Sequence, residues 1–418
     1  MEKLEIYKLD SNAVGVGKLN DRPCLCDGVI EGEEIEILEK VSFSKFDSVI
    51  SYNLIKSSEA RVKPLCKYFF ECGGCSLQHA DIQYQKKFKI NRVKNFLKHI
   101  ANIEVEKIEY IDSEKQYEYR NKIVFAVNDY QLGMYKKNSK EFLKIDKCML
   151  INSEMNGLYD IVARWVRINK IDINHVALRQ IGNIFVIVLI GDKKPEIKRL
   201  LHDLKSTKYN IEIVFNKNDA KKDLITDRLE IMYGSNPIFE YNDLKFPISA
   251  NSFLQVNNEI CEKLYNSVTN LVDNDVVLNA YSGAGLLSAI LSKKAKFVYG
   301  IEIVKNAHDN ANDLIKNNNI CNVKNFCGKS EEIVPRIMKE ISQATLVVDP
   351  PRKGVDEKLL ILINDTNKIK KVIYVSCDPN SLAKDLRVLK NYKIQEVKIF
   401  NMFPQSEHVE TLVCLIRK

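Results

Sequence analysis

The sequence of 418 residues predicts an α/β protein in which residues 246–418 form a doubly wound, mostly parallel sheet. Two observations predict this fold. Short apolar segments recur along the region, and helical patterns separate them. Strands that are buried on both faces and alternate with helices are typical of a parallel sheet covered by helices.

The expected strands cover residues 276–278, 297–301, 346–348 and 372–375. Helical patterns fill the gaps near 285–293, 304–318, 329–341 and 380–390. In sheets of this kind, ligands bind outside the carboxyl ends of the strands. The residues that follow each strand are therefore the first candidates for a functional site.

The N-terminal part has a different texture. Residues 35–39 and 48–50 resemble half-alternating strands, and Asp27-Gly28 and Glu31-Gly32 mark turns between strands. A small OB-like β-barrel over residues 1–59 fits this pattern, and such barrels often bind oligonucleotides. An inert β-module would give the same pattern.

Residues 60–245 mix strands and helices and are expected to form a central α+β domain. Gly182-Asn183 separates two apolar segments, which predicts a β-hairpin. A basic helical stretch over 81–100 could pack on the C-terminal domain. The net charge of +8 suits a polyanionic partner and, equally, a well-solvated surface.

Composition excludes some classes of protein. The N-terminus lacks the basic-then-apolar layout of a signal peptide. No apolar run approaches the roughly 20 residues needed to cross a bilayer. We therefore expect a cytoplasmic protein that has no membrane partner. In that compartment the eleven cysteines are not expected to form disulfides, so their spacing must indicate their role.

The first predicted strand runs into Tyr281-Ser282-Gly283-Ala284-Gly285. Gly283 and Gly285 permit a tight turn and leave room for a ligand at the helix N-terminus. The loop lacks the third glycine of a dinucleotide fingerprint and the Gly-Lys-Ser/Thr of a phosphate loop. The next strand ends at Glu302, whose carboxylate can accept hydrogen bonds from both ribose hydroxyls. The loop and the carboxylate together predict a ligand that contains a nucleoside, and both NAD and S-adenosylmethionine satisfy this prediction.

The third predicted strand ends in Asp349-Pro350-Pro351. Two prolines after a strand-end aspartate make a rigid lip at the ligand-binding edge of the sheet. Such a lip is familiar from enzymes that methylate bases and has no standard role in dehydrogenases. It therefore favours S-adenosylmethionine.

Cys377 follows the fourth strand and precedes Asp378-Pro379. A cysteine is most often a small buried hydrophobe, but one at a strand tip beside a cofactor site is a candidate nucleophile. A thiolate that adds to carbon 6 of uracil makes carbon 5 nucleophilic, and a general base must later remove the carbon 5 proton. Glu407, His408 and Glu410 are the candidate bases, and the residues alone do not separate them.

Together these motifs resemble the RNA uracil-C5 methyltransferase family, in particular its iron–sulfur branch acting on 23S rRNA. Ser252-Phe253-Leu254-Gln255-Val256-Asn257 resembles the family's Ser-Phe-Phe-Gln-x-Asn segment, with Leu254 at the second aromatic position. The resemblance covers nearly the whole chain. It implies a Rossmann-like class I methyltransferase domain over 246–418 and a TRAM-like RNA-binding barrel over 1–59.

The resemblance also implies roles for individual residues. Cys377 would be the nucleophile and Glu410 the base. Arg120 and Phe253 would lie near the target base. The S-adenosylmethionine contacts would be Gln255, Tyr281, Gly283, Gly285, Glu302 and Asp349.

Cys66, Cys72 and Cys75 lie in one glycine-containing loop, and any fourth metal ligand must come from elsewhere. Four thiolates suit zinc or a [4Fe–4S] cluster, and spacing does not separate them. The resemblance implies Cys148 as the fourth ligand and a [4Fe–4S] cluster. We expect that cluster to hold RNA-binding loops in place.

The implied partner is 23S rRNA, because the tRNA-specific bacterial branch usually lacks both the barrel and the cysteine cluster. No DNA is implied, and the protein is expected to be a monomer. Since some relatives with the cluster act on tRNA, a tRNA uridine methyltransferase is one alternative. A non-catalytic RNA-binding or ribosome assembly protein is a rival of another class. A cytosine-C5 methyltransferase shares the thiolate chemistry, but usually has its nucleophile in a Pro-Cys or Thr-Cys context.

Overall fold

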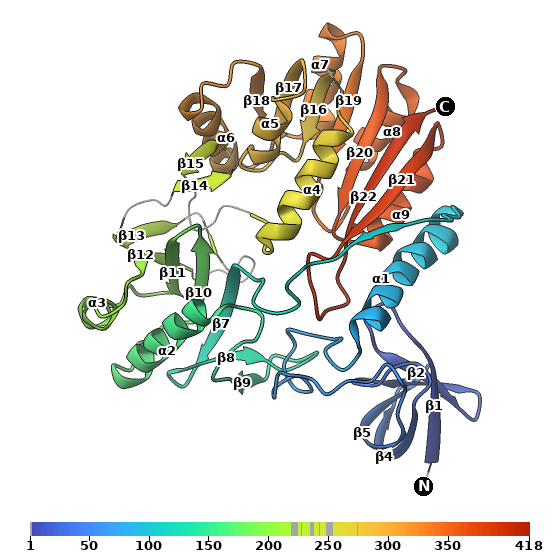
Figure 1. Ribbon diagram of the computed structural model, residues 1–418, viewed down its shortest axis with the longest axis vertical. Helices are drawn as coiled ribbons and strands as arrows, with labels where there is room; N and C mark the ends of the chain where they lie inside the picture. The colour runs from blue at the N-terminus through green and yellow to red at the C-terminus, as the bar shows by residue number, and fades with distance from the viewer. Residues whose placement is uncertain are drawn as a thin grey trace. The chain divides into compact units, whose positions relative to one another are not determined.

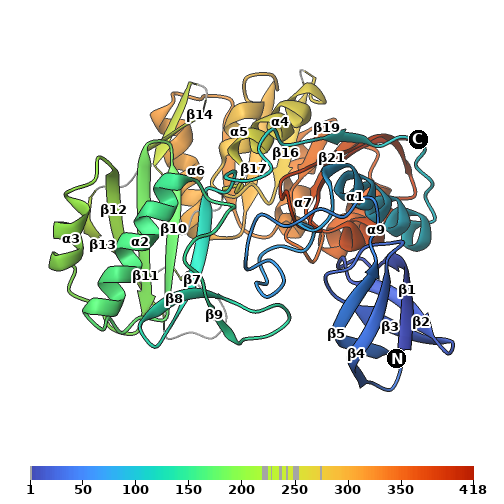
Figure 2. The ribbon, with the colours of Figure 1, turned by 60° about the horizontal axis from the view of Figure 1, so that its bottom comes forward.

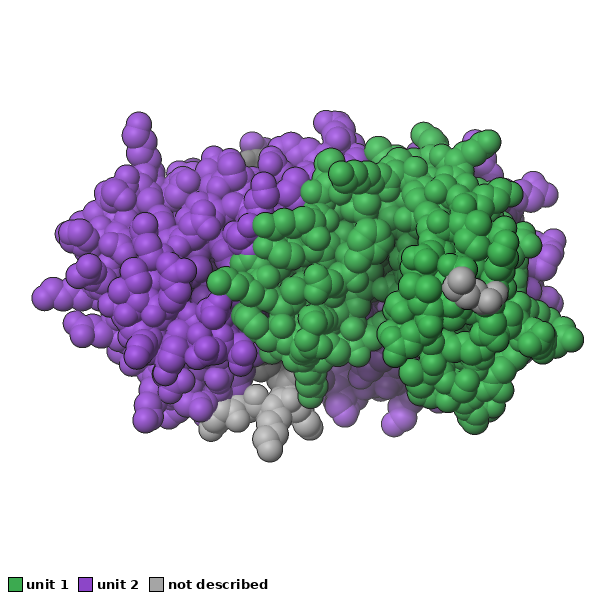
Figure 3. All heavy atoms as spheres, turned by 90° about the horizontal axis from the view of Figure 1, so that it is seen from below, with its two compact units in different colours: residues 1–93, 134–145, 403–408 green, residues 94–133, 146–402, 409–418 purple. Residues whose placement is uncertain are grey.

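The computed structural model describes residues 2–218, 225–226, 228–234, 238–241, 243–247, 254–273 and 275–418. The chain divides into two compact units, which Figure 3 distinguishes by colour. Unit 1 comprises residues 1–93, 134–145 and 403–408, and unit 2 comprises residues 94–133, 146–402 and 409–418. Among the described residues, no helix is long and apolar enough to span a membrane.

Unit 1 begins with a closed barrel, which is drawn in blue in Figure 2. Its strands are β1 (Glu2–Leu9), β2 (Gly15–Leu19), β3 (Arg22–Cys26), β4 (Glu34–Ser42) and β5 (Asp47–Lys56), in the order β1-β2-β3-β5-β4. Cys24 and Cys26 alternate with outward-facing residues on β3 and join the barrel core. The expected small N-terminal barrel is thus confirmed as a fold.

Helix α1 (Ile82–Phe96) fixes the segment 403–408 within unit 1. The Gln85 amide donates to Oε1 of Gln405 over 3.1 Å, and the buried Lys89 ammonium donates to the Phe403 carbonyl over 2.9 Å. The residues that follow, 94–133, belong to unit 2. There α1 continues as a π-helical turn, η1 (Leu97–Ala101), which contacts helix α9 (Pro379–Val388).

The smaller sheet of unit 2 places β13 (Leu229–Tyr233), β12 (Asn210–Lys217), β11 (Ile184–Gly191), β10 (His175–Ile181) and β7 (Lys122–Asn128) side by side in that order. β10 and β11 form the predicted hairpin around Gly182-Asn183. Helix α2 (Ser153–Ile168) packs on β10, and α3 (Lys198–Leu204) packs on α2. β8 (Gln131–Tyr135) pairs with β7, and β9 (Phe142–Lys144) follows along the chain.

The larger sheet of unit 2 has the order β18-β17-β16-β19-β20-β22-β21-β6. β16 (Val276–Ala280), β17 (Phe297–Glu302), β18 (Val323–Cys327), β19 (Ala344–Val348) and β20 (Ile369–Ser376) are parallel. β22 (Glu410–Arg417) lies antiparallel between β20 and β21 (Tyr392–Phe400), and β6 (Glu109–Ile111) runs parallel to β21. The prediction of a mostly parallel sheet is confirmed.

Helices cover both faces of this sheet (Figure 1). α4 (Asn258–Asn270), α5 (Leu286–Leu291) and α6 (Lys305–Asn317) form one layer, and α7 (Ser330–Glu340), α8 (Glu357–Asp365) and α9 form the other. β14 (Ile238–Tyr241) and β15 (Leu244–Pro247) make a separate hairpin. The fold therefore exposes the carboxyl edge of β16, β17, β19 and β20 as the place for a site.

Candidate active site

Four of the predicted site residues lie at the carboxyl edge of the larger sheet. Tyr281 follows β16, Glu302 ends β17, Asp349 follows β19 and Cys377 follows β20. These strands are parallel, and each pairs with its neighbour up to its last residues. The sheet therefore brings the four residues to the same edge, as the sequence predicts.

The loop after β16 depends on left-handed backbone at three positions. The φ angles are 62° at Tyr281, 54° at Gly283 and 84° at Gly285. A Cβ on Gly285 would lie 2.6 Å from the Cβ of Ala311, so glycine lets α5 approach α6. A Cβ on Gly283 would meet no described atom within 4 Å. The first glycine thus borders the open space that a ligand needs.

The Glu302 carboxylate fixes this loop against the end of β17. Its Oε2 accepts a hydrogen bond of 2.9 Å from the Gly283 N–H, and its Oε1 accepts one of 2.8 Å from the Val304 N–H. An ionised carboxylate has about four acceptor positions. Glu302 can therefore hold the loop and still accept hydrogen bonds from a ligand hydroxyl.

The Asp349 lip is anchored by Asp385 of α9, which the sequence did not predict. The Asp385 carboxylate accepts hydrogen bonds from the Val355 N–H over 2.8 Å and from the Tyr374 hydroxyl over 2.6 Å. Gly354 has φ 87°, and a Cβ there would lie 2.7 Å from Oδ2 of Asp385. In the sequence, Asp385 is an acidic residue within the helical pattern after Cys377, and nothing local shows that it binds the lip.

Cys377 and Glu410 lie at the paired ends of two antiparallel strands. Ser376 at the end of β20 pairs with Thr411 of β22. Cys377 follows Ser376 and Glu410 precedes Thr411, and the Glu410 carboxyl is near enough to raise the pKa of the Cys377 thiol. The candidate nucleophile and the candidate base therefore come together although they are distant in sequence.

Glu410 lies in an environment that opposes its ionisation. The residue is 2% exposed, and burial raises the pKa of its carboxyl well above the ordinary value. The neighbouring Asp349 raises the pKa further, and burial raises the pKa of Asp349 as well. Oε1 of Glu410 has no hydrogen-bond partner among the described residues. A buried carboxyl with an unsatisfied oxygen is typical of a functional group.

The Cys377 thiol is affected by the same environment. Burial is the largest influence and, with the Glu410 and Asp349 carboxyls, raises the pKa of the thiol to about 11, against the opposing effect of Arg352. A thiol with this pKa is protonated at neutral pH. Cys377 therefore needs a change in its surroundings before it can act as a thiolate.

Gln255 and Arg120 lie beside each other in unit 2. The Asn121 side chain donates to the Gln255 carbonyl over 2.9 Å, and the Asn121 N–H donates to the Val256 carbonyl over 2.8 Å. Arg120 forms an isolated antiparallel bridge with Asn257. The segment predicted to contact the cofactor and the arginine predicted to lie near the target base thus meet. Phe253, the other predicted base contact, lies outside the described residues.

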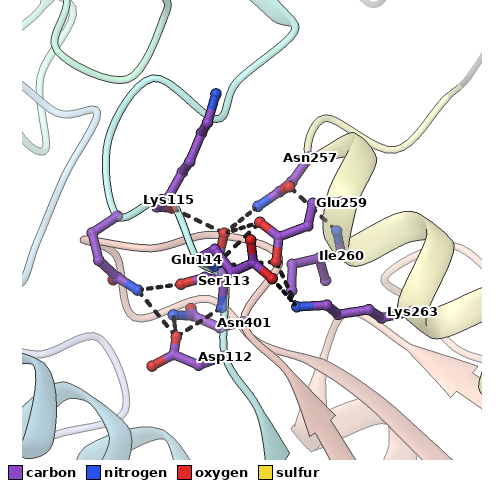
Figure 4. Close-up of polar contacts among 10 residues, drawn as sticks. Asp112, Ser113, Glu114, Lys115, Asn257, Glu259, Ile260, Lys263 and Asn401 are labelled. Carbon is purple, nitrogen blue, oxygen red and sulfur yellow. Dashed lines mark hydrogen bonds and ion pairs between the residues drawn. The ribbon is translucent and has the colours of Figure 1, made fainter.

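A polar network holds this segment at the start of α4 (Figure 4). Asn257 caps the helix by accepting from the Ile260 N–H, and its Nδ2 donates to the Ser113 hydroxyl over 3.1 Å. Glu259 accepts a hydrogen bond of 3.1 Å from the Glu114 N–H. The segment 112–116 therefore fixes the entry into α4, and with it the backbone beside Gln255.

The other two candidate bases are in unit 1. Glu407 accepts a hydrogen bond of 2.6 Å from the Ser76 hydroxyl, and its carboxylate lies 3.4 Å from Nε2 of His408. Glu410, by contrast, begins β22, which pairs with β20, and its carboxyl raises the pKa of the Cys377 thiol. The geometry therefore favours Glu410.

The predicted four-cysteine metal site is not confirmed. In the described part of the chain, no three His, Cys, Asp or Glu side chains are grouped so that they could hold a metal ion. Cys66, Cys72 and Cys75 belong to unit 1, and Cys148 belongs to unit 2. Burial raises the pKa of Cys72, and the nearby Cys66 raises it further. The described residues therefore show no ready-made metal site, and the cluster stays a prediction.

The chain is similar to known proteins along nearly its whole length. A family model described as tRNA (uracil-5-)-methyltransferase matches residues 82–418. An uncharacterized RNA methyltransferase from Clostridium acetobutylicum is 34% identical, with 99% of this chain and 96% of the relative covered. One from Listeria innocua is 33% identical, with 100% and 97% covered.

Among solved structures, the tRNA (uracil-54, C5)-methyltransferase of Pyrococcus abyssi, in complex with S-adenosyl-L-homocysteine, matches with a TM-score of 0.79. The two chains are 24% identical, and the match covers 99% of this chain and 100% of the other. At this identity the likeness shows a shared fold, which includes the mixed sheets and the small N-terminal barrel.

Proposed function

The chain belongs to the tRNA (uracil-5-)-methyltransferase family, and we propose that it transfers a methyl group from S-adenosylmethionine to carbon 5 of a uridine in RNA. The observation that supports this proposal is the Ser376–Thr411 pair, which joins the ends of β20 and β22, together with the influence of the nearby Glu410 and Asp349 carboxyls on the Cys377 thiol. Incubation of RNA with methyl-labelled S-adenosylmethionine, followed by nucleoside analysis, tests it. The proposal requires the label in 5-methyluridine, and label in 5-methylcytidine would contradict it.

The edge of the larger sheet fits S-adenosylmethionine. The space beside Gly283 and the remaining acceptor positions of Glu302 suit a ribose. We assign Tyr281, Gly285, Gln255 and Asp349 to the same cofactor, as the family resemblance implies. When bound there, S-adenosylmethionine supplies an electrophilic methyl group on a sulfonium. The Pyrococcus abyssi protein of the same fold was solved with S-adenosyl-L-homocysteine.

Cys377 and Glu410 divide the reaction on the uracil ring. The Cys377 thiol first loses its proton to solvent, and its thiolate Sγ then forms a bond to carbon 6. The electron pair released at carbon 5 forms the new bond to the methyl carbon, whose bond to the sulfonium sulfur breaks. Glu410, in its carboxylate form, then takes the proton from carbon 5. The returning electron pair restores the ring double bond and expels the Cys377 thiolate. Arg120 is proposed to position the base.

The raised pKa of Cys377 suggests an order for the reaction steps, in which the cofactor binds before the thiolate forms. In the free protein, burial first of all, and then the Glu410 and Asp349 carboxyls, raise the pKa of Cys377 and oppose formation of a thiolate. A positive charge next to these groups favours their ionised forms. The charge of the cofactor should therefore help to ionise Cys377, and the nucleophile forms only when a methyl donor is present.

We propose 23S rRNA as the substrate and a monomeric enzyme as the acting species, on the basis of the N-terminal barrel and the cysteine spacing. The alternative is tRNA, which the family description and the name of the Pyrococcus abyssi protein mention. Parallel assays with unmodified 23S rRNA and tRNA transcripts distinguish the two substrates. Faster methylation of the tRNA transcript would contradict 23S rRNA as the substrate. The TRAM-like RNA-binding role of the barrel is part of the same proposal.

The [4Fe–4S] cluster remains a prediction of the cysteine spacing and the family resemblance, and no step above depends on it. Iron and sulfide analysis of protein purified without oxygen tests it directly. About four iron and four sulfide per chain would support the cluster. Zinc in a stoichiometric amount, or no metal, would reject it.

A further inference from the structure

A pocket of about 700 Å³ lies in the part of unit 2 that is built on β10, β11 and α2. It is formed by the end of α2 with the following turn, by the loop after β11 and by the start of α3. None of its lining residues belongs to the candidate active site. They are Trp165, Asn169, Lys170, Ile171, Asp172, Lys193, Lys194, Pro195, Glu196, Lys198, Arg199 and His202.

The lining carries an excess of positive charge. Four lysines and one arginine stand against two acids, Asp172 and Glu196. Lys194 is paired with Glu230. The other cations have no hydrogen-bond or ion-pair partner within the described ranges, although carboxylates are present in the same pocket; they are Lys170, Lys193, Lys198 and Arg199. Their charges are therefore available to an anion.

Trp165 provides a second and independent observation. The residue lines the pocket but is only 1% exposed, and its indole N–H has no hydrogen-bond acceptor in the described structure. Neither Asp172 nor Glu196 accepts from it. Buried donors in native proteins are nearly always paired, so an unpaired one marks a place for an acceptor from outside the chain.

We propose that this pocket binds a phosphate group of the RNA backbone. A phosphodiester supplies acceptor oxygens for the Trp165 N–H and negative charge for Lys198, Arg199 and their neighbours. Recognition of a base would need an exposed aromatic face for stacking, and the buried Trp165 does not offer one. The inference rests on the proposed function, since it assigns part of the RNA-binding surface to this pocket.

The chain contains a single tryptophan, so intrinsic tryptophan fluorescence reports on this pocket alone. We expect unmodified tRNA or 23S rRNA transcripts to change the emission saturably and in a salt-dependent way. Inorganic phosphate should reproduce the change only weakly. A strong response to phosphate that RNA does not compete with would make this a free-anion site and overturn the proposal. So would the absence of any response to RNA.

Charge reversal at Lys198→Glu/Arg199→Glu tests the contact directly. The matched control is Lys205→Glu/Lys208→Glu, which makes the same charge change on exposed residues that do not line the pocket. The pocket variant should weaken RNA binding about tenfold or more and lower the slope of log affinity against log salt by about 1 per lost phosphate contact. Equal losses in both double variants would overturn the proposal.

Trp165→Phe keeps the apolar ring and removes the N–H. Filter binding should show several-fold weaker RNA affinity with an unchanged salt slope, because the lost donor is neutral. Wild-type affinity in this variant, with a native melting curve, would overturn the role of the N–H. Lys198→Glu/Arg199→Glu covers the case in which Trp165→Phe fails to fold.

The two proposals fail in distinguishable ways. If wild-type protein methylates no RNA but its tryptophan emission still responds to RNA, the proposed function fails and the pocket stands. If methylation occurs and the pocket variant keeps the wild-type KM for RNA, the pocket fails alone. The expected result is a raised KM for RNA with unchanged kcat and unchanged affinity for S-adenosyl-L-homocysteine.

Discussion

Cys377 and Glu410 flank the Ser376–Thr411 pair that joins β20 to β22. The thiol and the carboxyl are near enough that a charge on Glu410 raises the pKa of Cys377. Because β22 lies antiparallel to β20, the C-terminal segment brings Glu410, the proposed base, near Cys377, the proposed nucleophile. The proposed reaction depends on this relationship.

Replacing Cys377 with alanine should abolish methyl transfer without disturbing the cofactor site. The nucleophile has no substitute among its neighbours, since Glu410 and Asp349 are buried acids. We expect kcat to fall by at least about 10³-fold. Calorimetric titration with S-adenosyl-L-homocysteine should show near-wild-type affinity. Activity within tenfold of wild type would mean that the reaction does not proceed through this thiol.

Glu410→Gln should separate formation of the adduct from its resolution. The amide cannot take the carbon 5 proton, so a methylated RNA–protein complex should accumulate while turnover falls by about 10²- to 10⁴-fold. Denaturing gels measure the complex. Glu407→Gln is the matched control, because that carboxylate bonds Ser76 in unit 1 and should leave turnover near wild type. The reverse pattern would assign the base to Glu407.

The reactivity of Cys377 should depend steeply on pH. Its pKa is raised to about 11, so the protonated thiol dominates at neutral pH and the thiolate fraction grows about tenfold per pH unit up to that value. Alkylation of the Cys377 peptide by iodoacetamide, followed by mass spectrometry, measures it. Sinefungin, which carries a positive amine, should move the profile to lower pH than neutral S-adenosyl-L-homocysteine does. Identical profiles with the two ligands would reject ionisation by the cofactor charge.

The two loop glycines should respond differently to alanine. Gly285→Ala combines φ 84° with a contact of 2.6 Å to Ala311, so we expect a loss of about 2–4 kcal/mol in the free energy of unfolding. Gly283→Ala meets no described atom within 4 Å and should cost about 1–2 kcal/mol. Its methyl group instead enters the ligand space and should weaken cofactor binding. Urea unfolding and calorimetry check both values, and equal stability losses would contradict the packing argument.

The sequence predicts the edge of the larger sheet well, because β16, β17, β19 and β20 are short apolar runs that end in polar residues. The sequence does not show which strand pairs with β22, because the pairing of Thr411 with Ser376 joins segments that are distant in the chain. For that reason spacing alone could not separate Glu410 from Glu407 and His408. Asp385 was missed for a similar reason, because its partners lie in other elements.

Helix α8 was also missed. Residues 359–363 form a continuous apolar run, which periodicity does not distinguish from a buried strand. Asp356 caps the helix by accepting from the Lys358 N–H, a signal that is visible in the sequence only once the helix is suspected. The predicted meeting of Cys148 with the other three thiols rests on the resemblance, and no local pattern dictates it.

The most direct test of the central claim uses RNA in which 5-fluorouridine replaces uridine. In this RNA, fluorine replaces the hydrogen at carbon 5. Glu410 therefore has no proton to remove, and the covalent adduct between Cys377 and the base cannot break down. With S-adenosylmethionine present, we predict an RNA–protein complex that survives denaturation and carries the nucleotide on the Cys377 peptide. A protein that makes 5-methyluridine in ordinary RNA but forms no complex with either fluorinated rRNA or tRNA, or forms one on another residue, would contradict the account.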